Sequence, residues 1–187
     1  MNRKLKPLIG IIVFGIVFAA TIFIYNIVIN MGEGPINLAQ RGFEPGEAMR
    51  PAPDFVIQDF NGVYLYSSEF KGKPIVLSFW NTWCNSCVVH MPLFSDLYWG
   101  RYGDLHVLKV NLLDGERETL DSVLGFMVRN DYTFPIYFDQ TGESANNYGI
   151  TSVPVTVFIN ADGYIRYRIH GSVTEASLQR GLDFIIG

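Results

Sequence analysis

The sequence predicts an α/β domain with a mixed central sheet that carries helices on both faces. A continuous apolar run, residues 74–80, and a second segment, residues 105–110, are both expected to be strands buried on both faces of a sheet. A stretch with apolar residues at helical spacing follows each run. Two further strands around a turn and a last helix complete the chain. An order of βαβ, then a hairpin, then a helix is typical of a mixed sheet.

Local signals place the individual elements. Asn61-Gly62 marks the turn of an N-terminal β-hairpin extension, because this dipeptide adopts the positive φ of tight hairpins. Pro92 should bend the first helix, since proline cannot donate a backbone hydrogen bond, and Thr174 can cap the last one. The expected elements are strands 55–57, 63–66 and 74–80, a helix over 84–102, strand 105–110, helices 116–129 and 142–148, strands 155–159 and 164–169, and a helix from 174.

The N-terminus has the pattern of a membrane anchor. Residues 8–29 contain no charged residue, and crossing the hydrocarbon of a bilayer takes about 20 apolar residues. A cleaved signal peptide, the alternative, has a shorter apolar core followed by small residues, whereas Ala19-Ala20 lies inside this run. We expect residues 1–30 to form an uncleaved signal anchor with one transmembrane helix. Because its basic residues all precede the apolar run, the rest of the chain should lie on the extracytoplasmic side of the cell membrane.

The remaining chain divides into a linker and one domain. Residues 31–53 are rich in glycine and proline, as linkers are, and residues 54–187 suffice for one hydrophobic core. Three of the 14 basic residues and none of the 18 acidic residues precede residue 31, so the remainder carries a net charge of −7. Such an acidic body argues against binding nucleic acid. A composition that is 49% hydrophobic and 17% charged excludes a disordered chain.

The only two cysteines, Cys84 and Cys87, lie between a buried strand and the start of a helix. The first helical turn presents unpaired N–H groups and the positive end of the helix dipole, and both stabilise a thiolate. Cys84 should therefore be a nucleophile with a lowered pKa. Cys87, one turn further on, should resolve a mixed disulfide formed on Cys84. We expect a dithiol–disulfide cycle that requires no cofactor and no metal.

Other interpretations of the pair are weaker. A structural disulfide across two intervening residues closes too small a loop to add much stability. A zinc site needs two more ligands, and His90 is the one candidate among the neighbours. Two idle thiols outside the cytoplasm would oxidise, which leads back to a disulfide.

Val153-Pro154 lies directly before the strand 155–159 and is a second candidate feature. A cis peptide bond there would pack Pro154 beside the cysteines and leave the backbone of Val153 free to pair with an extended client segment. An ordinary trans proline at the start of a strand is the alternative, and the frequencies of the two isomers favour it.

These features resemble the thioredoxin fold. More narrowly, they are similar to the membrane-anchored TlpA/ResA/CcmG group of thiol-disulfide oxidoreductases, which are redoxins of the AhpC/TSA-like kind. The residues that carry the resemblance are Ala52–Phe55, the Asn61-Gly62 hairpin, Leu77–Cys84, Cys87, Pro92, the helical insertion at 114–130, Thr133–Pro135, Val153–Thr156 and Asp162-Gly163.

The resemblance implies an extracytoplasmic thiol-disulfide oxidoreductase that usually reduces its clients. It implies that Val153–Pro154 is cis. It also implies a frequent client, apocytochrome c, whose haem-binding cysteines must be reduced before haem attachment in cytochrome c biogenesis. The electrons would come from a membrane partner of the CcdA/DsbD type.

Three differences from related proteins bear on the mechanism. His90 stands where the group often has a glutamate, and one helical turn from Cys87 it could relay a proton; alternatively, it is a partly exposed helix residue without a role. Ser78 stands where ordinary thioredoxins carry a buried aspartate, so an aspartate base is not expected. Asn85-Ser86 between the cysteines is also atypical, and the residues at these positions help to set the redox potential.

Trp83 adjoins Cys84 and, with Val153, should shape the surface that meets the client, whereas His106 and His170 are interpreted as structural. Two other functions remain open. The protein could be a general disulfide oxidase or isomerase of secreted proteins, because the same residues serve both directions. It could also be a non-enzymatic tethered module with an inert disulfide. A peroxidase would need a Thr/Pro/Arg setting that is absent around Cys84.

Overall fold

The computed structural model describes residues 15, 18–23, 50–100 and 104–186. The chain forms two units, residues 1–38 and 39–187, and each is considered by itself. The predicted anchor over residues 1–30 lies outside the described residues except for the helical residues 15 and 18–23, and most of the predicted linker is also outside them. No helix within the described ranges is both long enough and apolar enough to cross a membrane.

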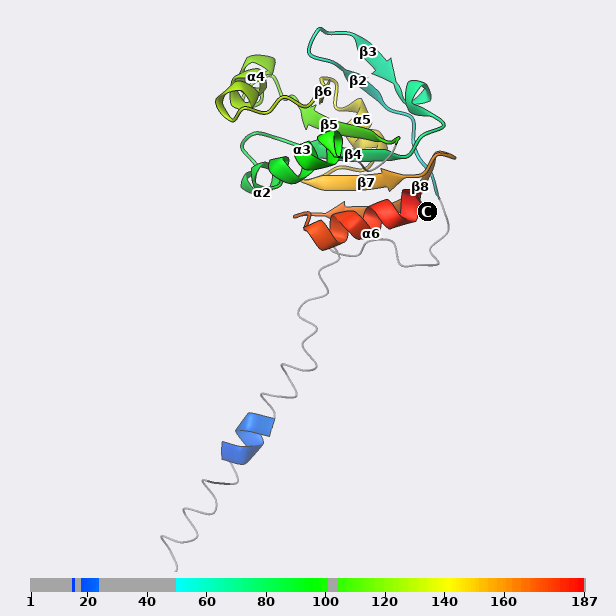
Figure 1. Ribbon diagram of the computed structural model, residues 1–187. Coiled ribbons are helices and arrows are strands. Elements are labelled where there is room, and N and C mark those ends of the chain that lie inside the picture. The colour runs from blue at the N-terminus through cyan, green and yellow to red at the C-terminus, as the bar shows by residue number, and fades with distance from the viewer. Residues whose placement is uncertain (1–14, 16–17, 24–49, 101–103, 187) are drawn as a thin grey trace, which may run out of the picture. The chain divides into compact units, whose positions relative to one another are not determined.

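The described part of the second unit contains one mixed sheet of eight strands (Figure 1). β4 (Ile75–Trp80) lies in its centre and pairs in parallel with β5 (His106–Leu112) and antiparallel with β7 (Val155–Ile159). The strand order is β1-β8-β7-β4-β5-β6-β2-β3. The other strands are β1 (Arg50–Pro51), β2 (Val56–Gln58), β3 (Tyr64–Tyr66), β6 (Ile136–Asp139) and β8 (Tyr164–His170).

Helices cover both faces of the sheet, as the sequence predicts. On one face, buried residues of α3 (Met91–Trp99), α4 (Leu120–Arg129) and α6 (Glu175–Ile186) form one core cluster with even-numbered residues of β4. On the other face, odd-numbered residues of β4 pack against the short 3-10 helix η2 (Ser67–Phe70) and the C-terminal end of α5 (Glu143–Asn147). All six residues of β4 are buried, which explains why its sequence is a continuous apolar run.

The predicted β-hairpin is present as β2 and β3, which pair antiparallel around the predicted turn. Two helix boundaries differ from the predictions. The helix expected over 84–102 is divided into α2 (Asn85–Val89) and α3, which meet at His90, with Pro92 in the first turn of α3. The helix expected over 116–129 begins at Leu120, because the Thr119 side chain accepts a hydrogen bond from the Ser122 N–H and caps it.

Two strands have no counterpart among the predicted elements. β6 has only four residues, too few for a strand pattern to stand out beside the preceding proline. β1 has two residues and falls within the predicted linker, where it pairs with β8. The identity of both strands depends on partners that are distant in the sequence.

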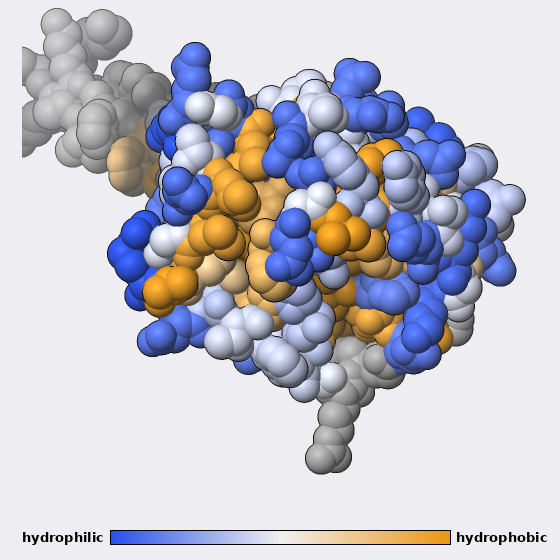
Figure 2. Space-filling model, turned by 90° about the horizontal axis from the view of Figure 1, so that it is seen from above, coloured by the Kyte–Doolittle hydropathy of each residue, from blue (hydrophilic) through white to orange (hydrophobic). Residues whose placement is uncertain are grey.

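Apolar side chains also reach the surface of the domain. Figure 2, in which the molecule is seen from above relative to Figure 1, shows them as patches between polar side chains. The exposed large apolar residues include Phe60 and Val63 at the β2–β3 hairpin, Trp83 next to the cysteine pair, and Val89 on α2. Of these, Trp83 lies where the sequence places the chemistry.

Candidate active site

Cys84 and Cys87 form a disulfide at the point where β4 gives way to α2, with Sγ atoms 2.10 Å apart. Cys84 is the N-cap of α2, and its Sγ accepts a hydrogen bond from the Cys87 N–H at 3.2 Å. Cys84 is 6% exposed and Cys87 is 1% exposed. Cys84 is thus the less buried residue of the pair, and the roles of nucleophile and resolving thiol stay predictions.

Two donors lie next to the Cys84 sulfur. Besides the Cys87 N–H, the Ser86 Oγ is 3.4 Å away and can donate its hydroxyl proton to the sulfur. Hydrogen bonds to the charged form of a group favour that form. Reduced Cys84 would thus be stabilised as a thiolate by its own first helical turn, and the Ser86 of the atypical Asn85-Ser86 pair takes part directly.

The Val153–Pro154 peptide bond is cis, as the resemblance implies. The Val153 carbonyl oxygen lies 3.7 Å from the Cys84 Sγ, which is a contact distance, since a disulfide sulfur has no proton to donate. Pro154 is buried, and its carbonyl accepts a hydrogen bond from the Gly171 N–H. The fold thus brings Val153 against Cys84 from a position 69 residues away.

Trp83 is 44% exposed beside Cys84. The guanidinium carbon of Arg117 lies 4.5 Å from the centre of its ring, in a cation–π contact. Arg117 comes from the segment 113–119 between β5 and α4, which is called the insertion loop below. Sequence reasoning missed Arg117, because no motif links one arginine of a polar loop to a tryptophan far from it in the sequence.

The insertion loop also holds the segment before Cys84 through the fully buried Glu118. Its carboxylate accepts hydrogen bonds from the backbone N–H and the hydroxyl of Thr82, each at 2.7 Å, and from the side-chain amide of Asn111. Asp114 in turn accepts from the Glu118 N–H, and its backbone hydrogen bonds lower the pKa of the Asp114 carboxyl. Glu118 was also missed, since a lone glutamate in an acidic loop carries no signal.

His90 is the C-cap of α2 and the N-cap of α3. Its Nδ1 is a buried atom without a hydrogen-bond partner among the described residues. The proton-relay role of His90 stays a prediction. Of the other two histidines, His106 packs edge-on against Phe70, with ring centroids 5.1 Å apart. Burial lowers the pKa of both His106 and His170.

Comparison with known proteins assigns the chain to a family. Residues 48–168 match the AhpC/TSA family. The chain belongs to the AhpC/TSA family. This redoxin is 34% identical over 142 residues to the thiol-disulfide oxidoreductase ResA of Bacillus thuringiensis subsp. konkukian (strain 97-27), an alignment that covers 76% of this chain and 80% of that protein. With its cysteine pair at disulfide distance, it is a thiol-disulfide oxidoreductase of the protein-disulfide reductase type.

Solved structures agree with this assignment. The crystal structure of StoA from Bacillus subtilis superimposes on the redoxin with a TM-score of 0.60 at 29% identity, covering 71% of this chain and 97% of StoA. The structure of a DsbF homologue from Corynebacterium diphtheriae gives a TM-score of 0.65 at 20% identity, covering 81% of this chain and 96% of that one. At that identity the second comparison shows the fold alone, which is thioredoxin-like.

Beneath the helices of the redoxin's active site, three polar side chains form a row across the buried sheet. Ser78 of β4 is the register partner of both Lys109 of β5 and Thr156 of β7. The Lys109 Nζ and the Thr156 hydroxyl each donate a hydrogen bond to the Ser78 Oγ at 3.2 Å. The sequence analysis drew attention to Ser78 alone, because Ser78 stands where ordinary thioredoxins carry an aspartate, and Lys109 was passed over within the expected strand 105–110.

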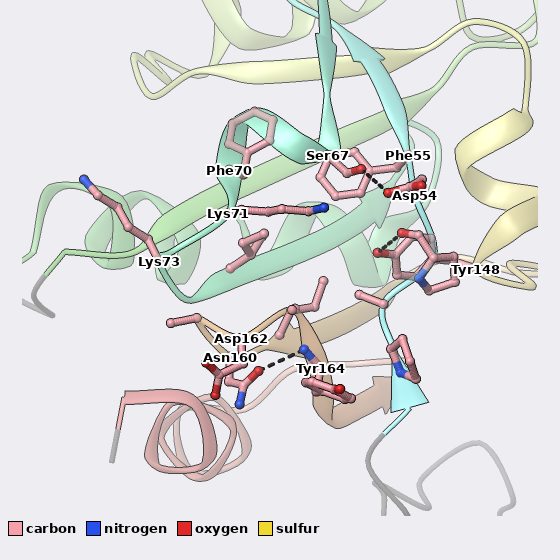
Figure 3. Close-up of a pocket in the computed structure, with 17 residues that line it drawn as sticks. Asp54, Phe55, Ser67, Phe70, Lys71, Lys73, Tyr148, Asn160, Asp162 and Tyr164 are labelled. Atoms are coloured by element: carbon pink, nitrogen blue, oxygen red, sulfur yellow. Dashed lines mark hydrogen bonds between the residues drawn. The ribbon is translucent and has the colours of Figure 1, made fainter.

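A hollow of about 240 Å³ lies at the other end of the sheet (Figure 3). Residues at the start of β4 and the end of β7 line it, whereas the cysteines follow the end of β4. Figure 3 shows the hydrogen bond from Ser67 to Asp54 on its wall, and Tyr148 donates another to the Pro53 carbonyl. No cysteine lines this hollow, so it is not part of the redox site.

Proposed function

We propose that this redoxin reduces disulfides of client proteins on the extracytoplasmic side of a cell membrane, and that apocytochrome c is among those clients. The observation that carries the proposal is the surface around Cys84. Cys84, the less buried residue of the pair, directly follows the exposed Trp83 in the chain, and its sulfur contacts the carbonyl of Val153. An extended client segment that pairs with the Val153 backbone would bring its own disulfide to Cys84.

The reaction is an exchange in two steps. The Cys84 thiolate attacks one sulfur of the client disulfide, which forms a mixed disulfide and releases the other client sulfur as a thiolate. The Cys87 thiol, as its thiolate, then attacks the Cys84 sulfur and frees the second client sulfur. Two electrons pass to the client, which leaves as a dithiol, and the Cys84–Cys87 disulfide is formed.

The proposal includes the membrane. Residues 1–30 would be a single-pass signal anchor, residues 31–53 would link it to the domain, and the bilayer would hold the redoxin near its electron donor. That donor would be a membrane dithiol protein of the CcdA/DsbD type, which reduces the Cys84–Cys87 disulfide after each turnover. The basic residues before the apolar run and the resemblance to the anchored redoxins support this arrangement.

Trapping tests the client. Cys87→Ser should hold its client on Cys84 as a mixed disulfide, because the resolving thiol is missing. The variant without both cysteines, Cys84→Ser/Cys87→Ser, is the matched control and should hold none. Mass spectrometry of full-length protein isolated from its own cells should find apocytochromes. A broad set of unrelated secreted proteins would instead favour the general oxidase or isomerase, and no mixed disulfide at all would favour an inert module.

The side of the membrane and the direction of electron flow need separate measurements. A thiol reagent that does not cross membranes should label the reduced pair in intact cells, and labelling only after lysis would contradict the extracytoplasmic placement. The potential of the pair can be measured against glutathione. A value near about −120 mV, as in strong disulfide oxidants, would sink the reductase proposal.

A further inference from the structure

Lys109 is a buried cation that the exchange reaction described above does not use. Its side chain is 1% exposed. Among the described residues no carboxylate forms an ion pair with it, and its one hydrogen-bond acceptor is the neutral hydroxyl of Ser78. Burying an amine without a counter-charge is costly, so the burial of Lys109 calls for an explanation.

The aromatic rings around the amine connect it to the cysteines. The Nζ lies 4.2 Å from the centre of the Phe94 ring and 5.4 Å from that of Trp80. Both rings belong to the same buried cluster as Cys84 and Cys87. Phe94 follows Cys87 by about two helical turns across the α2–α3 junction, and Trp80 precedes Cys84 by four residues. A charge is screened less in such a buried cluster than in water, so an ammonium on Lys109 would act on the sulfurs over a longer range than an exposed one.

The charged groups on the elements around Lys109 are engaged elsewhere or exposed. Asp96 on α3 is exposed. Asp139 at the end of β6 accepts a hydrogen bond from Ala145, and Glu118 is held by Thr82 and Asn111. The other titratable groups of these elements are His90 at the α2–α3 junction, the two thiols, the partly buried His106 of β5, the exposed Tyr98 of α3 and the partly buried Tyr137 of β6. A charge on Lys109 is therefore not neutralised by a neighbour.

We propose that Lys109 is a positioning residue for disulfide exchange, which takes up a proton when the pair is reduced and whose ammonium then favours the thiolate of Cys84. The step balances. The disulfide accepts two electrons from a dithiol donor, and two protons accompany them. One proton goes to the Cys87 sulfur and the other to the Lys109 Nζ, while Cys84 remains a thiolate and the donor becomes a disulfide.

The amine is able to play this part at neutral pH. Burial lowers the pKa of Lys109 to about 7 in the disulfide form of the protein. An ordinary lysine would already be protonated in both redox states and could take up no proton. When a thiolate forms nearby, its negative charge raises the affinity of the amine for a proton, and the ammonium in turn favours the thiolate. Ordinary thioredoxins carry a buried aspartate where this chain has Ser78. Here Lys109, the hydrogen-bond partner of Ser78, would be the buried titratable group that responds to reduction of the pair.

The test is a titration of the Cys84 thiolate in the full-length chain in detergent, with dithiothreitol as the reductant. Lys109→Met removes the charge and keeps an apolar stem, an exchange that is often neutral or stabilising for a buried ion. The midpoint of Cys84 ionisation, measured from the rate of alkylation against pH, should rise by about one pH unit in this variant. Below the midpoint, the fraction of Cys84 present as thiolate should then be about tenfold smaller than in the wild type. Because the reduced form loses this stabilisation, the equilibrium constant for reduction by dithiothreitol should fall by up to about tenfold near neutral pH.

Two further variants make the result decisive. Lys71→Met removes an exposed lysine at the hollow on the other end of the sheet and should leave both measurements unchanged. Ser78→Ala removes the acceptor of the Lys109 ammonium and should raise the midpoint in the same direction by less. An unchanged midpoint in Lys109→Met overturns the proposal. If Lys109→Met does not fold, an unchanged midpoint in Ser78→Ala overturns it. Neither readout involves a cellular client, so the outcome is independent of the proposed role in cytochrome c biogenesis.

Discussion

Glu118 is the residue through which the insertion loop holds the active-site segment, and its removal can be predicted quantitatively. Glu118→Ala leaves the Thr82 N–H, the Thr82 hydroxyl and the Asn111 amide without their common acceptor. A hydrogen bond to a charged group contributes about 1.5–3 kcal/mol, and a buried donor left unpaired costs about 1–3 kcal/mol. Since Thr82 is only partly buried, water can replace some of the loss. We expect the free energy of unfolding to fall by about 3–4 kcal/mol.

Urea unfolding of the oxidised protein, followed by tryptophan fluorescence, measures this change. Glu118→Gln is the matched control, because an amide keeps the shape and one acceptor oxygen, and it should lose about half as much. The alanine variant should also reduce the rate at which Cys84 exchanges with a small disulfide, since the Thr82–Trp83 segment before it is released. A stability within about 0.5 kcal/mol of the wild type, the range of ordinary surface substitutions, would refute the reasoning.

Three other predictions concern separate features of the structure. Gly181→Ala should destabilise the fold by about 1–3 kcal/mol in a thermal melt, because a Cβ at this position of α6 would clash with the Phe158 ring of β7. The control Gly125→Ala in α4 would meet only the flexible end of the Arg129 side chain and should be neutral or stabilising. His90→Ala should shift the pH profile of thiol alkylation if this histidine relays a proton, and an unchanged profile removes it from the mechanism. Arg117→Ala should alter the fluorescence of the exposed Trp83 and slow exchange with peptide disulfides while the unfolding midpoint stays the same; equal exchange rates would show that the stacked cation has no part in client contact.

The sequence predicted those parts of this molecule whose signals are local. The hairpin turn, the buried run of β4 and the cysteine pair between strand and helix depend on neighbours within a few residues, and the structure has all three. The short strands β1 and β6 could not be predicted from the sequence, because their signals are not local. Each exists because a long-range partner pairs with it, β8 in one case and β5 in the other.

The cis Val153–Pro154 bond beside Cys84 could be predicted from the family resemblance but not from the residues alone. Residue chemistry left both isomers open and favoured trans, whereas the resemblance implied cis. The roles of Glu118 and Arg117 followed from neither source, because they arise from where the insertion loop packs. A composition that is merely acidic and polar gives no indication that one of its carboxylates is fully buried.

The distribution of buried polar side chains connects the fold with the chemistry. Six of the nine buried polar residues in the described part of the domain lie in or next to the strands and the loop around the cysteine pair; they are Ser78, Asn81, Lys109, Asn111, Glu118 and Thr156. Each costs free energy to bury unless it is well paired, and apolar residues at the same positions would complete the core. A fold selected for stability alone would not concentrate them at one end of its central strands. Glu118 holds the segment that precedes Cys84. In the proposed mechanism, the row of Ser78, Lys109 and Thr156 holds the amine that takes up a proton when the pair is reduced. The requirements of disulfide exchange therefore explain these costs best.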